Sequence, residues 1–493
     1  MKKQLKSYSG ITLVALVVTI VILIILAVIS INIVFNEGGI VKQAEKAKEH
    51  QANAEIADNE KLGMLDNSIK EYMNGNKGYV DNELITSPKI SEGMIPVYWN
   101  GSNWIKTTTD DSKWYNYTNK EWANIVLSDA TFNGNVLDES KPYSQLVWIP
   151  RFAYKITSGW HSSDTGTVEV VFVGTDNQGK DGTIYNETYA EATNGIVSGG
   201  AMKNYVVEPA FDYGDKKLEG FWIGKFESSH TGCTTDVATG QATFIGNEVM
   251  QIKPNVKSWR NITIGDSFTT CLNMNKENNS YGLISNDNVV DPHLVKNTEW
   301  GACAFLSKSK YGKETEEVYI NNSSDYITGN AGNVVDSVSG TGIINAYNTP
   351  AGQKASTTGN IYGVYDMSGG NWERVAAYVN NKHENLQTYG KSLVNGENKY
   401  KEIYEQGTAD TQELNYGKAA VKYGDAIYET SNGYSSSSAS WYSDWANFIY
   451  IENPFFVRGG RFLNVNGAGI FCFSWTTGDI GDGLGFRVTI PVI

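Results

Sequence analysis

Little in this sequence indicates a redox, metal-binding or nucleic-acid-binding protein. The 493 residues include only four cysteines, and these form neither a CxxC pair nor a metal-ligand spacing: Cys233, Cys271, Cys303 and Cys472. A disulfide between two of them stays open, as does burial of free thiols in the core. The formal net charge of -14 leaves no basic cluster beyond the first few residues. This charge argues against a nucleic acid partner.

Familiar catalytic motifs are missing as well. The sequence has no GxSxG, HExxH or P-loop motif. Its five histidines are isolated from one another, so they do not have the spacing of metal ligands. We therefore assign no catalytic and no metal-binding residue from motifs.

Proline is scarce, whereas glycine and aromatic residues are abundant. Ten prolines stand against 50 glycines, 29 tyrosines and 13 tryptophans. This composition is typical of many short strands and turns. With 41% hydrophobic residues the chain has ample material for a core, so we expect a loop-rich globular head.

The N-terminal region has the pattern of a membrane anchor. Lysines at positions 2, 3 and 6 precede an uncharged apolar run over 11–35, which is long enough to cross a bilayer. Residues 36–75, rich in Ala, Glu, Lys and Gln, predict a helical stalk. We expect a single-pass membrane protein of a bacterial cell envelope with an extracellular C-terminal domain.

The first residues also resemble the prepilin-type cleavage and methylation segment of type IV pilins. A basic leader over 1–10 ends in Gly10 and is followed by Ile11, Thr12 and a long apolar stretch. The resemblance implies cleavage between Gly10 and Ile11 and assembly with pilus proteins. Ala15 departs from the pattern, because pilins have a glutamate there that takes part in assembly. An uncleaved signal anchor is the alternative.

Two regions of the head follow. Residues 76–140 read as a small aromatic-rich β segment, in which the Trp and Tyr side chains pack on strands or form a sugar-stacking platform. From 146 onwards an ordered series of motifs resembles the formylglycine-generating enzyme, or sulfatase-modifying factor, family. The motifs are LVWIPRFAYKI (146–156), FWIGKFESS (221–229), NTEWGACAF (297–305), NIYGVYDMSGGNWERV (360–375), VRGGRF (457–462) and GFRV (485–488).

This resemblance implies a C-type-lectin-like domain over 141–493 with an insertion over 380–450. The expected fold class is therefore α+β: an N-terminal transmembrane helix and helical stalk followed by a C-type-lectin-like mixed domain. The family can hold a structural calcium ion, for which Asp366, Asn371 and Glu373 would supply oxygens. We expect no other cofactor.

The chemistry of that family is not expected here. The enzyme binds copper through two cysteines, but Asn464 and Gly469 occupy the matching positions, and Cys472 is the only cysteine nearby. We therefore expect a protein that is not an enzyme. An enzyme with altered chemistry is kept as an alternative.

The segment over 457–488 resembles the variable region of proteins diversified by retroelements. That resemblance implies an exposed ligand-binding set, whose Trp, Ser, Thr, Asn and Asp side chains have the composition of an antibody paratope. The set is Arg461, Leu463, Asn464, Asn466, Ser474, Trp475, Thr476, Thr477, Asp479, Asp482 and Leu484. The alternative is an ordinary closing hairpin. Four aromatic residues of the insertion are expected to frame the face: Tyr434, Trp441, Tyr442 and Trp445.

These observations favour a surface-anchored, non-enzymatic recognition protein whose ligand is a protein or a glycan on another cell or surface. The alternative is a minor pilin or pseudopilin of a type IV pilus or a type II secretion-like system.

Overall fold

The computed structural model describes residues 20–24, 26, 84–233, 248–335 and 337–493. The chain divides into two compact units, Met1–Tyr79 and Val80–Ile493. In the first unit the described residues, 20–24 and Leu26, are helical and exposed. Nearly all of the second unit is described, and we call it the head.

The expected membrane anchor and localisation require correction. Within the described ranges, no helix combines the length and the apolar character that crossing a bilayer takes. The prediction of a single-pass membrane protein is therefore withdrawn. The expected cleavage site at Gly10 and Ile11 and the stalk over 36–75 lie outside the described residues.

The larger sheet of the head has nine strands, all paired antiparallel, in the spatial order β15-β23-β12-β6-β3-β1-β2-β5-β4. Its strands are β1 (Met94–Trp99), β2 (Trp104–Lys106), β3 (Asn124–Leu127), β4 (Phe132–Asn133), β5 (Val136–Leu137), β6 (Gln145–Pro150), β12 (Gly220–Gly224), β15 (His293–Leu294) and β23 (Val488–Ile490). β6 and β12 are continuous apolar runs because both of their faces are buried. Trp148 and Trp222 pair across them, with ring centroids 5.1 Å apart.

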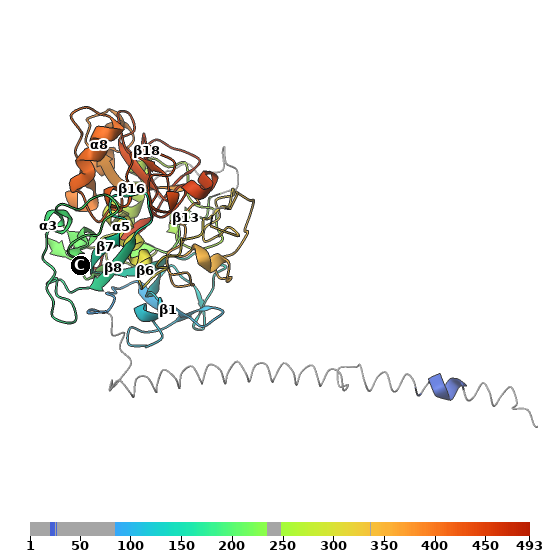
Figure 1. Ribbon diagram of the computed structural model, residues 1–493. Helices are drawn as coiled ribbons and strands as arrows, with labels where there is room; N and C mark the ends of the chain where they lie inside the picture. Colours follow the sequence, from blue (N-terminus) through green and yellow to red (C-terminus); the bar gives the residue numbers. More distant parts are fainter. Residues whose placement is uncertain (1–19, 25, 27–83, 234–247, 336) are drawn as a thin grey trace, which may run out of the picture. The chain divides into compact units, whose positions relative to one another are not determined.

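The second sheet has seven strands and is mixed. β20 and β21 pair antiparallel at its centre, whereas β16 pairs in parallel with β17 and β22. Its strands are β16 (Trp372–Val379), β17 (Glu402–Tyr404), β18 (Ser435–Ser436), β19 (Ala446–Asn447), β20 (Phe455–Arg458), β21 (Phe473–Thr476) and β22 (Leu484–Phe486). Figure 1 shows β1 and β18 at opposite ends of the head.

Smaller elements complete the head. A three-stranded sheet comprises β7 (Phe152–Ser158), β8 (Thr167–Phe172) and β9 (Val206–Val207). Two short hairpins are β10 (Asp212–Tyr213) with β11 (Lys216–Lys217), and β13 (Ser229–His230) with β14 (Met250–Gln251). The α-helices are α3 (Tyr189–Thr193), α4 (Ile264–Leu272), α5 (Asn297–Lys308), α6 (Asn385–Thr388), α7 (Lys391–Asn395) and α8 (Gln412–Lys418).

The expected α+β class is wrong. The described residues form mainly β-sheets with a few short helices, and the longest described helix, α5, has 12 residues. The boundary expected near residue 140 also does not divide two sheets, because β3 pairs with β6. Three of the four tryptophans of the expected aromatic segment, Trp104, Trp114 and Trp122, are fully buried, which favours packing in the core over a sugar platform.

The insertion over 380–450 contributes to the sheet and the core of the head. It contributes β17, which pairs with β16, and buried tyrosines such as Tyr400 and Tyr404. Its polar residues bond within the head: the side chain of Asn415 donates to the main-chain oxygen of Ile449 over 2.9 Å. The insertion is thus part of the folded head.

Candidate ligand-binding site

Two loops of the C-terminal segment lie next to each other. The first follows β20 and includes the 3-10 helix η9 (Phe462–Gly467), and the second covers 477–483 between β21 and β22. A Cβ atom on Gly483 would lie 3.0 Å from Nη1 of Arg461, which places the two loops in contact. We call the surface formed by residues 461–466 and 477–484 the C-terminal face.

The main chain of the second loop is held from outside the loop. Four of its carbonyl oxygens accept hydrogen bonds from other segments. The oxygen of Gly478 accepts from the Ile264 N–H (3.0 Å), that of Asp479 from the Arg374 guanidinium, that of Gly481 from the Asn261 N–H (3.0 Å), and that of Asp482 from the Arg260 guanidinium (2.9 Å). This backbone is therefore fixed without using the side chains of Ile480 and Asp482, which are exposed.

Both arginines that hold the loop are fully buried. Arg374 comes from β16, and burial lowers the pKa of its guanidinium to about 9, while the carboxylates of Asp479 and Asp266 oppose that shift. The guanidinium of Arg260 lies 4.1 Å from the ring centroid of Tyr326, in cation–π geometry. A buried charge is costly unless it is paired and hydrogen-bonded. The bonds to the carbonyl oxygens of the loop therefore stabilise both guanidinium groups in their position beneath it.

The first loop is held by hydrogen bonds within its own segment and by packing of Phe462. The main-chain N–H of Arg461 donates to Oδ1 of Asn464 over 2.8 Å, and the Ala468 N–H donates to the Val465 oxygen over 3.0 Å. The ring of Phe462 packs edge-on against Tyr326, with centroids 5.0 Å apart. Tyr326 thus contacts a residue of the first loop and the arginine that holds the second.

The structure divides the eleven predicted binding residues. Exposed or partly exposed side chains belong to Arg461, Leu463, Asn464, Asn466, Trp475, Thr477, Asp479, Asp482 and Leu484. Ser474 and Thr476 were expected to be exposed but are only 9% and 6% accessible, because they lie on the central strand β21. Ile480, which the sequence did not single out, is 58% exposed.

The aromatic frame expected from the insertion is only partly present. Trp441 is fully buried, and its indole N–H donates to the Gly159 oxygen over 3.0 Å. The main-chain N–H of Trp445 donates to the Gly467 oxygen, so this residue does adjoin the first loop. Trp475 packs edge-on against Tyr450, at 5.7 Å between centroids.

The residues expected to ligate calcium are engaged by donors of the chain itself. Asp366 accepts from the side chain of Asn321 (2.8 Å), and Glu373 pairs with Arg487 (2.5 Å). The Asn371 amide donates to Glu227 (2.6 Å). Among the residues described, no group of three or more His, Cys, Asp or Glu side chains could hold a metal ion.

Cys472 is placed for packing rather than for chemistry. It is fully buried, and burial raises the pKa of its thiol well above the ordinary value. Cys271 and Cys303 are likewise buried free thiols. A thiol with a raised pKa is a poor nucleophile and a poor metal ligand. Cys472 therefore gives no support to the alternative of an enzyme with altered chemistry.

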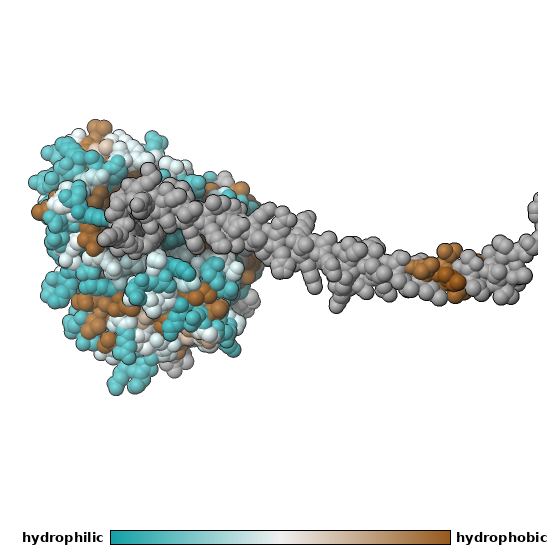
Figure 2. Space-filling view, turned by 90° about the horizontal axis from the view of Figure 1, so that it is seen from below, coloured by the Kyte–Doolittle hydropathy of each residue, from teal (hydrophilic) through white to brown (hydrophobic). Residues whose placement is uncertain are grey.

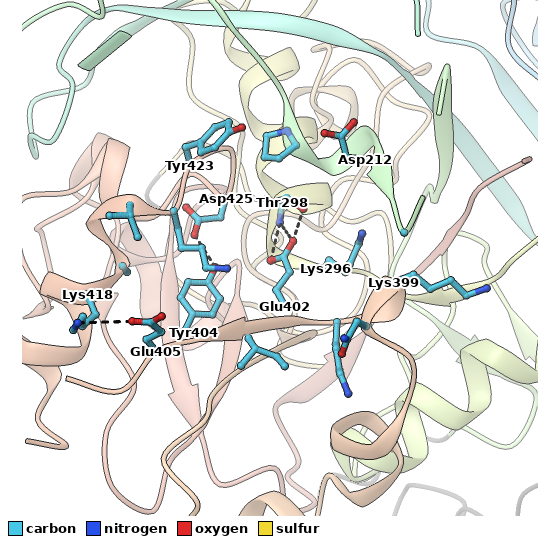
Figure 3. A pocket seen from close by; sticks show the side chains of 18 residues that line it. Asp212, Lys296, Thr298, Lys399, Glu402, Tyr404, Glu405, Lys418, Tyr423 and Asp425 are labelled. Carbon is cyan, nitrogen blue, oxygen red and sulfur yellow. Dashed lines mark hydrogen bonds and ion pairs between the residues drawn. The ribbon is translucent and has the colours of Figure 1, made fainter. Parts of the chain in front are cut away.

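A separate pocket of about 640 Å³ opens beside the insertion, and no sequence motif pointed to it. Its walls come from 209–214, from the start of α5, from 398–405 and from 418–425. Figure 3 shows Glu402 in this pocket, with Lys296 and Lys399 to one side of it and Asp425 to the other. These segments lie far apart in the sequence, which is why no local pattern predicted the site.

Glycine at one helix position brings two walls of the pocket together. A Cβ atom on Gly301 of α5 would overlap the main-chain oxygen of Gly424. Without it the 424–425 backbone lies directly on the helix, and Asp425 is placed at the pocket wall. The start of α5 is capped by Glu402, whose carboxylate accepts from the N–H and the hydroxyl of Thr298.

Comparisons with known proteins add little to this picture. No family model matches the chain, and no curated protein matches its sequence. Among solved structures, the chain is similar to the "Major Tropism Determinant P3c Variant", with 12% sequence identity and a TM-score of 0.25. That match covers 85% of this chain and 89% of the other chain. A score this low leaves both fold and function to be argued from the head itself.

Proposed function

We propose that this chain is a non-enzymatic recognition protein whose C-terminal face binds a partner. The observation that carries the proposal is the way in which the loop over 477–483 is held. Its carbonyl oxygens bond to Arg260, Asn261, Ile264 and Arg374, so the backbone is fixed while the side chains of Ile480 and Asp482 point to solvent. A rigid backbone with free side chains loses little conformational entropy on binding.

The composition of the C-terminal face favours a protein partner. Leu463 and Ile480 are 52% and 58% exposed, beside the polar Asn466 and Asp482. A complex is stabilised when a protein surface excludes water from exposed apolar side chains. A glycan offers fewer apolar groups for such a contact. A binding screen that includes both classes of ligand distinguishes a glycan ligand from a protein partner.

The same arrangement supports a surface that accepts sequence variation. The donors that fix the second loop belong to Arg260, Asn261, Ile264 and Arg374, which lie outside the segment resembling a diversified region. Replacing Leu463, Asn466, Ile480 or Asp482 would leave those bonds in place. Function would then change with the side chains while the fold is kept.

The test is a screen of the purified full chain against arrays of cell-surface proteins and of glycans. Each hit is measured again with L463S/I480S and with a matched control, I184S/V197S, which replaces two residues that are 58% and 75% exposed elsewhere. We expect the face variant to weaken binding at least about tenfold and the control to bind normally. Equal binding by both variants would refute the proposed face.

A further inference from the structure

The 640 Å³ pocket is a second candidate site, independent of the C-terminal face. None of the residues at 461–466 or 477–484 lines it. Its volume lies within the range of small-molecule sites, about 300–1,000 Å³. The pocket is therefore large enough to hold a small ligand.

Lysines outnumber acids in the lining of the pocket. Five of the eighteen lining residues are lysines: Lys296, Lys399, Lys401, Lys418 and Lys422. Four are acids: Asp212, Glu402, Glu405 and Asp425. The lining therefore has a small formal excess of positive charge in a chain whose formal net charge is -14, and such an excess favours an anionic ligand.

The two acids deepest in the pocket already have donors within the protein. The carboxylate of Glu402 accepts from Thr298, with its N–H at 3.2 Å. Asp425 accepts from the Tyr404 hydroxyl over 2.7 Å and from the Ile427 N–H over 3.0 Å. Burial raises the pKa of both carboxyls.

The lysines differ in how far their charge is compensated. Lys399 pairs with Asp291 (2.6 Å), and Lys418 pairs with Glu405 at the rim (3.7 Å). The ammonium of Lys401 donates to two main-chain oxygens, those of Val394 and Gly396, rather than to an acid.

Lys422 has its ammonium 5.2 Å from the ring centroid of Tyr404. None of the ion pairs among the described residues includes Lys422, but its charge acts on the carboxyls of Glu402 and Asp425 and opposes the rise in their pKa. Its ammonium keeps N–H donors that can bond to a ligand.

Apolar groups stand beside these charges. Val421 is 79% exposed, Ile403 is 38% exposed, and both line the pocket together with Pro209 and Tyr423. A ligand seated here would meet ammonium groups at one part of its surface and apolar side chains at another. This combination suits a molecule with an anionic head and an apolar or aromatic body.

We infer that this pocket binds a small organic anion, whose carboxylate or phosphate lies against Lys422 and whose apolar body lies against Val421, Ile403 and Tyr423. Two kinds of head group share this chemistry. Two probes separate them: benzoate carries a carboxylate and phenyl phosphate carries a phosphate. Benzyl alcohol is the neutral control of similar size.

The experiment is isothermal titration calorimetry of the full chain with each probe at low ionic strength. Lys422→Met keeps the apolar stem but removes the charge, Lys422→Arg keeps the charge, and Lys106→Met is the matched control. Lys106 is exposed and lies 5.9 Å from the ring centroid of Phe132, so the control also removes an ammonium that stands over an aromatic ring.

We expect at least one anion to bind and benzyl alcohol not to bind. Lys422→Met should weaken the anion about tenfold or more, because a charge-assisted hydrogen bond is lost. Lys422→Arg and Lys106→Met should bind within about twofold of the parent chain, which is well under the tenfold effect of one lost charge-assisted bond. The inference is overturned if neither anion binds, if benzyl alcohol binds as tightly, or if Lys422→Met binds normally.

Discussion

The guanidinium of Arg260 donates a hydrogen bond of 2.9 Å to the main-chain oxygen of Asp482, from below the loop that carries the side chain of Asp482 into solvent. Arg374 does the same for the oxygen of Asp479. The two arginines therefore separate two requirements of a binding surface: they fix the backbone and leave the side chains unconstrained. This separation leads to the first two predictions.

Removing a supporting arginine should loosen the loop. Arg260→Met loses the bond to Asp482 and the contact with Tyr326, and leaves a main-chain oxygen without its donor. We expect a loss of about 2–4 kcal/mol in the free energy of unfolding. Amide hydrogen exchange should accelerate over 478–483. Lys203→Met, which changes an exposed cation elsewhere, should alter neither quantity. Unchanged exchange in Arg260→Met would show that the arginine does not hold the loop.

Substitution at the exposed positions should cost little stability. We expect single changes of Leu463, Asn466, Ile480 or Asp482 to Ser to shift the free energy of unfolding by about 0.5 kcal/mol or less. Phe473→Ala on the neighbouring strand β21 should cost about 3–5 kcal/mol, because it leaves a cavity in the core. Urea denaturation measures both. A loss above about 2 kcal/mol at an exposed position would mean that its side chain is structural.

Gly301 should be irreplaceable for the pocket. Gly301→Ala puts a Cβ atom into the main-chain oxygen of Gly424, so α5 and the 424–425 segment must move apart. We expect a destabilisation of about 2–3 kcal/mol and weaker binding of any anion that the pocket takes. Gly417→Ala in α8 is the control, because its Cβ would meet no atom within 4 Å. That change should be neutral or stabilising by up to about 1 kcal/mol. If both glycine variants behave alike, close packing at Gly301 does not shape the pocket.

Stability should fall as the pH rises through the titration of Glu429. Burial raises the pKa of this carboxyl from 4.5 to about 8, although the Tyr154 hydroxyl and the Gly424 N–H oppose the shift. The folded state therefore binds the proton more tightly than the unfolded state. The stability from the protonated carboxyl is complete below about pH 4.5 and is lost as the pH rises through about 8.

Glu429→Gln should remove this part of the pH dependence. Between pH 5 and 8 we expect the parent chain to lose stability relative to the variant, by a few kcal/mol in order of magnitude. Denaturant midpoints at several pH values measure the difference. Glu405→Gln, at an exposed carboxyl, should keep the parent slope. A parent and a Glu429→Gln variant with parallel pH profiles would contradict the assignment.

The sequence predicted local elements better than their assembly. Two of the motifs that carry the family resemblance coincide with regular elements: FWIGKFESS begins within β12, and NTEWGACAF lies within α5. Each of these patterns is carried by neighbouring residues, which is why it could be read. The pairing of β3 with β6 joins segments about twenty residues apart and left no local sign, so the sequence did not predict that these two regions of the head share one sheet.

The site was predicted only in part for the same reason. The resemblance over 457–488 implied an exposed set of residues, but Ser474 and Thr476 of that set are buried on the central strand β21. Arg260 and Arg374 reach the second loop from distant segments, and a lone arginine in a sequence gives no sign of its acceptor. The lysines of the pocket come from separate segments of the chain, so the sequence does not distinguish them from ordinary surface lysines.

The most direct test of the account is a hydrogen-exchange footprint of the full chain with and without a protein partner from the binding screen. We predict that amides over 461–466 and 477–484 become protected on binding, while those around Ile184 and Val197 do not change. Protection confined to the region of Ile184 and Val197, with the C-terminal loops unaffected, would contradict the proposal that this face recognises the partner.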